Sequence, residues 1–71
     1  MRDNLDLATS AQELADSAPA GSVSRAAAAS VAITCATTRD VDQARTTLDG
    51  LAPEEVRLAA LELFDRLQGV Q

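Results

Sequence analysis

The stretch PEEVRLAALELFDRLQGV, residues 53–70, decides the fold of this chain because its apolar residues recur at helical spacing. At about 100° per residue, most of them form one stripe along a helix. The stripe consists of Val56, Ala59, Ala60, Leu63, Phe64, Leu67 and Val70. Leu58 and Leu61 fall outside it, on a side that is otherwise polar. Such a helix either packs on two sides within its own bundle or offers its second side to another protein chain.

The rest of the chain also favours helices, because apolar and polar residues nowhere alternate as they do in strands. The first helix has two possible starting points and an apolar stripe at helical spacing, which consists of Leu7, Ala11, Leu14 and Ala18. The expected helices are Asn4 or Ser10 to Ala18, Ser22 to Thr37, Asp40 to Asp49, and Pro53 to Val70. Short connections between them predict roughly antiparallel neighbours.

Capping residues mark the ends of these segments. Asp40 is a favourable N-cap, and Gln43 has the spacing of a reciprocal capping partner. Gly50 is the expected C′ residue of the same helix. Pro53 suits the first turn of the last helix, where Glu54 and Glu55 favour the helix dipole.

The second helix stands out because it is almost free of charge. Arg25 is its only charged residue, and the 13 residues from Ala26 to Thr38 carry none. A helix that is apolar or small on every side is typical of the buried centre of a domain. We therefore expect an all-α single domain over residues 1–71, a bundle of four short helices with this small-residue helix at its centre.

Composition limits the partners. The net charge of −5 argues against nonspecific binding to nucleic acid and to anionic membranes, and it leaves another protein as the expected partner. A single cysteine excludes an intrachain disulfide and favours the reducing cytoplasm. The wealth of alanine and arginine, without lysine, fits a GC-rich coding sequence from a bacterium, phage or plasmid.

Residues suited to catalysis are scarce. Without histidine or lysine, Cys35 and the serines lack an ordinary activating base, so we expect no enzyme activity and no small-molecule substrate. Cys35 is expected to be a packed thiol, with an intermolecular disulfide as the alternative. The acidic pairs at 40/42 and 54/55 are explained by helix capping and by the helix dipole. No metal or cofactor motif is present in the sequence.

A helix-turn-helix was also considered, because the third and fourth helices are joined by a short turn containing glycine. A recognition helix that begins with Glu54 and Glu55 would present the wrong charge to phosphates and base edges. Binding to DNA is therefore disfavoured.

These observations predict a non-enzymatic protein-binding module, such as a small intracellular regulator, inhibitor or assembly factor. It would act by occlusion or bridging through the last helix, with Arg57, Leu58, Leu61 and Asp65 nearest the contact. The alternative is a homo-oligomeric structural protein, for example a homodimer, that uses the same helix for self-association.

Overall fold

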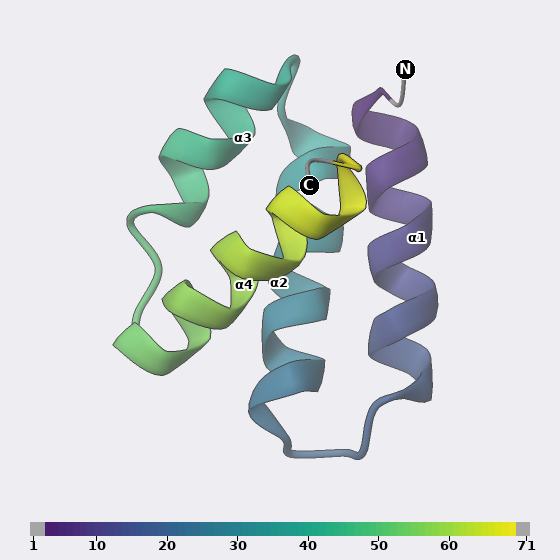
Figure 1. Ribbon diagram of the computed structural model, residues 1–71, viewed down its shortest axis with the longest axis vertical. Helices are drawn as coiled ribbons and strands as arrows, with labels where there is room; N and C mark the ends of the chain where they lie inside the picture. The colour runs from purple at the N-terminus through teal and green to yellow at the C-terminus, as the bar shows by residue number, and fades with distance from the viewer. Residues whose placement is uncertain (1–2, 70–71) are drawn as a thin grey trace.

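Four α-helices follow one another in the computed structural model, which describes residues 3–69 (Figure 1). They are α1 (Asn4–Ser17), α2 (Val23–Thr37), α3 (Val41–Leu48) and α4 (Glu54–Leu67). No strand occurs between residues 3 and 69. The prediction of a small all-α bundle is confirmed.

Helix α2 is central, as predicted, because it packs against each of the other three helices. Helices α1 and α2 run antiparallel, and α4 crosses in front of α2 in Figure 1, with α3 beside it. The core between them is built mostly from small residues. Its largest fully buried side chains are Phe64, Leu7, Leu48, Val31 and Cys35.

The helix starts follow from capping side chains. Asp3 accepts a hydrogen bond from the Asp6 N–H at 2.9 Å, which starts α1 at Asn4 rather than at Ser10. Ser22 caps α2 by accepting from the Arg25 N–H at 3.1 Å.

The start of α3 has the predicted reciprocal cap with one change. Asp40 accepts from the Gln43 N–H at 2.8 Å, as expected. The Gln43 side chain reaches back one residue further than a regular capping box, and accepts from the Arg39 N–H at 2.8 Å.

Two residues at the α3–α4 joint differ from their predictions. Gly50 does not adopt the left-handed conformation of a C′ residue; its N–H instead bonds the Thr47 carbonyl at 3.1 Å and tightens the last turn. Pro53 lies one residue before α4, and its carbonyl accepts from Val56 and Arg57, so it closes the first turn from the N-cap position. Val70, predicted to end the apolar stripe, lies outside the described residues.

A tertiary hydrogen bond that the sequence does not reveal joins the two ends of the α1–α2 hairpin. The buried Asn4 amide donates to the Thr38 carbonyl at 3.1 Å and to the Thr38 hydroxyl at 3.0 Å. The Thr38 hydroxyl in turn donates to the Thr34 carbonyl at 2.7 Å. This chain of bonds fixes the start of α1 against the end of α2, where carbonyls would otherwise lack partners.

Helix α2 is not buried on every side, which corrects the prediction for this uncharged segment. Ile33 is 65% exposed, and Ala26 and Ala36 beside it are exposed as well. The reason is that α1, α3 and α4 cover only the side of α2 that carries Ala28, Val31 and Cys35.

Candidate protein-binding surface

The predicted contact residues of α4 separate into two groups. Leu58 is 55% exposed, whereas Leu61 is half-buried and packs against the core. Leu61 therefore belongs to the side of α4 that its own bundle covers, and Leu58 is left on the outward side. Of the two leucines outside the helical stripe, only Leu58 is left without cover from the bundle.

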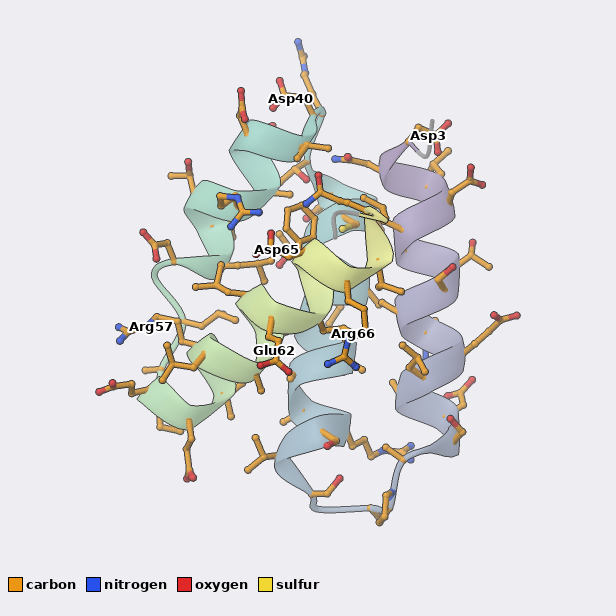
Figure 2. All side chains as sticks on the ribbon, viewed as in Figure 1. Asp3, Asp40, Arg57, Glu62, Asp65 and Arg66 are labelled. Carbon is orange, nitrogen blue, oxygen red and sulfur yellow. The ribbon has the colours of Figure 1, made fainter. Side chains whose placement is uncertain are left out.

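The two charged residues that were predicted to lie at the contact, Arg57 and Asp65, both form ion pairs within the chain. Asp65 pairs with Arg45 of α3, and the Arg45 guanidinium also lies 5.4 Å from the centre of the Phe64 ring. Arg45 thereby links α3 to α4 by charge and by a cation–π contact. Arg57 is paired with Glu54 at 3.7 Å, and its side chain points away from the bundle in Figure 2.

Carboxylates surround Leu58 on the outward side of α4. Glu54, Glu55 and Glu62 each lie within one turn of it, and all three are exposed. Glu62 accepts from Arg66 at 2.9 Å, the predicted i,i+4 pair (Figure 2). Glu55 forms no ion pair within the described part of the chain, so this side of α4 remains acidic.

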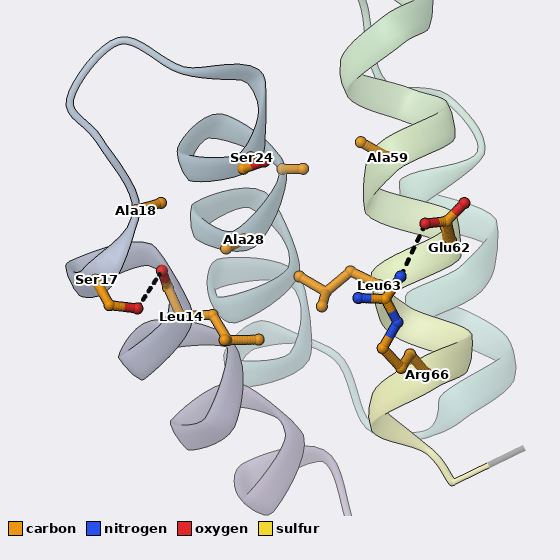
Figure 3. A pocket seen from close by; sticks show the side chains of 10 residues that line it. Leu14, Ser17, Ala18, Ser24, Ala28, Ala59, Glu62, Leu63 and Arg66 are labelled. Carbon is orange, nitrogen blue, oxygen red and sulfur yellow. Dashed lines mark hydrogen bonds and ion pairs between the residues drawn. The ribbon is translucent and has the colours of Figure 1, made fainter.

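A half-open groove of about 320 Å³ borders this side of α4 and is formed by α1, α2 and α4 (Figure 3). Leu14 of α1 and Leu63 of α4 point into it, and alanines of α2 form its floor. Leu14 was expected in the core stripe of α1 but is 41% exposed, because α4 crosses at an angle and leaves this flank open.

Glu62 connects the groove to Leu58. It lines the groove, and it follows Leu58 by four residues on the same helix. Arg66, the ion-pair partner of Glu62, lines the groove as well. We term Leu58, Glu62 and the groove residues Leu14 and Leu63 the α4 surface. The sequence pointed to Leu58, but it contained no signal that Leu14 would be exposed and would line a groove against α4.

The remaining reactive groups have structural roles. Cys35 is 1% exposed, and burial raises the pKa of its thiol, which disfavours the reactive thiolate. Asp40 is occupied as the cap of α3, and Asp42 stands in the first turn of the same helix. Within residues 3–69, no group of three potential metal-ligating side chains comes together.

The same residues include no helix with the length and apolar character needed to cross a membrane. Comparisons with protein-family models, with curated proteins and with solved structures found no match to this chain.

Proposed function

We propose that this chain is a non-enzymatic protein-binding module that acts through the α4 surface. The observation that carries the proposal is Leu58, which is more than half exposed on a helix whose other leucines pack at least partly against the core or the groove. Complete burial of a leucine side chain gains about 1.5–3 kcal/mol, so burial of the exposed 55% of Leu58 by a partner would gain about 0.8–1.6 kcal/mol.

Charge indicates the kind of partner. Leu58 lies among three glutamates in a chain with a net charge of −5. The complementary surface is an apolar pocket framed by arginine or lysine side chains. Binding there would occlude a basic site on the partner, or bridge two proteins, as expected of a small regulator, inhibitor or assembly factor.

The two predicted residues with charged side chains frame this contact rather than form its centre. Arg57 and Asp65 are already paired within the chain, so a partner must compete with Glu54 and Arg45 for them. Exposed pairs of this kind contribute about 0–1 kcal/mol each, and they can rearrange at low cost.

The test uses two variants with equal charge change. Leu58→Glu alters the α4 surface, and Ile33→Glu alters an exposed isoleucine on another side of the molecule. The wild-type chain and both variants are immobilised, incubated with lysate of the source cells, and the retained proteins are quantified by mass spectrometry.

We expect at least one protein to be retained by the wild type and by Ile33→Glu but lost at least about tenfold with Leu58→Glu. Its retention should fall as salt rises from about 0.05 M to about 0.5 M, because screening weakens the attraction between opposite charges. Equal retention of every protein by all three chains would rule out the α4 surface as a binding site.

A further inference from the structure

Helix α3 lies at the edge of the bundle and has little of its surface buried. It packs against α2 and α4, whereas α1 lies on the opposite side of α2 in Figure 1. We term residues 39–52, which contain α3 and its two connections, the α3 segment. Of its fourteen residues, Ala44 and Leu48 are buried and ten are exposed. A segment with so few buried side chains can separate from its neighbours at a lower cost than global unfolding.

Most hydrogen bonds of the α3 segment link its own residues. Asp40 accepts from the Gln43 N–H at 2.8 Å. The hydroxyls of Thr46 and Thr47 donate to carbonyls of the preceding turn at 3.0 and 3.1 Å. Since these bonds are internal, they do not hold the segment against α2 or α4.

The residues on either side of the α3 segment are fixed by bonds that do not involve it. Thr38, which precedes the segment, accepts two bonds from the Asn4 amide at 3.1 and 3.0 Å. Pro53, which follows it, accepts at its carbonyl from the Val56 and Arg57 N–H groups. Helices α1, α2 and α4 can therefore keep their mutual contacts when the segment moves.

Arg45 joins the α3 segment to α4. Its guanidinium pairs with Asp65 and lies 5.4 Å from the centre of the Phe64 ring. The side chains of Arg45 and Asp65 are 44% and 47% exposed, so solvent screens the ion pair and its contribution to stability is small. Arg45 is therefore a weak contact that holds the segment over one side of the Phe64 ring.

We propose that the α3 segment opens as one unit while α1, α2 and α4 stay packed, and that this opening uncovers Phe64. The open form presents an apolar site on α2 and α4 that the closed form hides, because Leu48 and Phe64 are both fully buried when the segment is closed. A helix of eight residues is not stable alone in water. Helix α3 therefore loses its internal bonds when it separates, and its amides become open to exchange together.

Hydrogen exchange of the backbone amides, followed by NMR, tests this proposal through the protection factor, the ratio by which structure slows exchange. Ala44 and Asp49 report from the two ends of α3, where their N–H groups bond the Asp40 and Arg45 carbonyls at 3.0 and 2.9 Å. Their protection factors should agree within about threefold and lie at least about tenfold below those of the central amides of α2. Protection equal to that of α2, or a larger difference between Ala44 and Asp49, would overturn the proposal.

Two variants separate opening of the α3 segment from unfolding of the whole chain. Ser22→Ala removes the N-cap of α2, which the closed and the open form both contain. It should lower the protection of the α2 amides about fivefold and leave that of Ala44 and Asp49 unchanged. Arg45→Ala removes a contact that only the closed form contains, so it should lower the protection of both groups of amides by the same factor, at least about twofold.

Equal losses in both groups of amides with Ser22→Ala would mean that α3 exchanges only when the whole chain unfolds. Unchanged protection of α3 with Arg45→Ala would mean that Arg45 does not hold the segment closed. Either result would overturn the proposal. Neither variant alters Leu58 or the glutamates around it, so these outcomes are independent of the partner-capture experiment.

Discussion

Phe64 provides the sharpest test of how this fold is held together, because it is the only aromatic residue of the chain and is fully buried. It fills the space between α4 and the other helices, where most of the remaining core residues are alanines. A buried phenylalanine removes about 150–250 Å² from water, which at about 25 cal/mol per Å² corresponds to about 4–6 kcal/mol.

Phe64→Ala retains the Cβ and permits some collapse, so we expect a loss of about 3–5 kcal/mol in the free energy of unfolding. A chain of 71 residues has a total stability of about 4–10 kcal/mol, so the variant should be close to unfolding at 25 °C. The Arg45 guanidinium above the ring adds a smaller loss of about 0.5–1 kcal/mol.

Urea unfolding followed by circular dichroism at one fixed chain concentration measures this loss. Tryptophan and tyrosine fluorescence cannot serve, because the chain has neither residue. Leu58→Ala is the matched control on the same helix, and it should change stability by no more than about 0.5 kcal/mol. A Phe64→Ala loss below about 1 kcal/mol, or a larger loss with Leu58→Ala, would refute the assignment of Phe64 to the centre of the core.

Two further predictions concern other contacts. Asn4→Ala should lower the free energy of unfolding by about 1–2 kcal/mol, because the Thr38 carbonyl loses its amide donor, whereas the exposed Thr9→Ala should have little effect in the same urea assay. Burial raises the pKa of the Cys35 thiol above its ordinary 9.0, so the unfolded chain loses this proton first and stability should fall as pH rises above about 9. With no lysine or tyrosine to titrate there, Cys35→Ala should flatten that decline, and an unchanged decline would contradict the burial of the thiol.

The four helices could be predicted from the sequence because residues close to each helix end determine where the helix begins or stops. Asp40, Ser22 and Pro53 act on backbone groups within four residues, and their effect does not depend on the rest of the fold. The prediction of a left-handed C′ conformation at Gly50 was wrong because two backbone geometries can provide hydrogen bonds to the last carbonyls of a helix. Which of them forms depends on where the next helix begins.

The exposed side of α2 could not be predicted in the same way. The alanine side chain has little apolar surface, so a helix with alanine on all sides has no clear apolar stripe. Val31 and Ile33 are both branched apolar residues at different angular positions on α2, and which of the two is buried depends on the side that α1, α3 and α4 occupy. The same holds for Leu58 and Leu61, since the angle of α4 against the other helices decides which one the bundle covers.

The two exposed apolar surfaces have a common origin in the small side chains of the core. Helices with alanine at their contacts approach closely and leave little room between them for large residues. Leu58 and Ile33 lie on the uncovered sides of α4 and α2. Leu58 is surrounded by glutamates, whereas Ile33 lies beside alanines of α2 and shares a groove with Glu13 of α1. The acidic surround of Leu58 favours a basic partner.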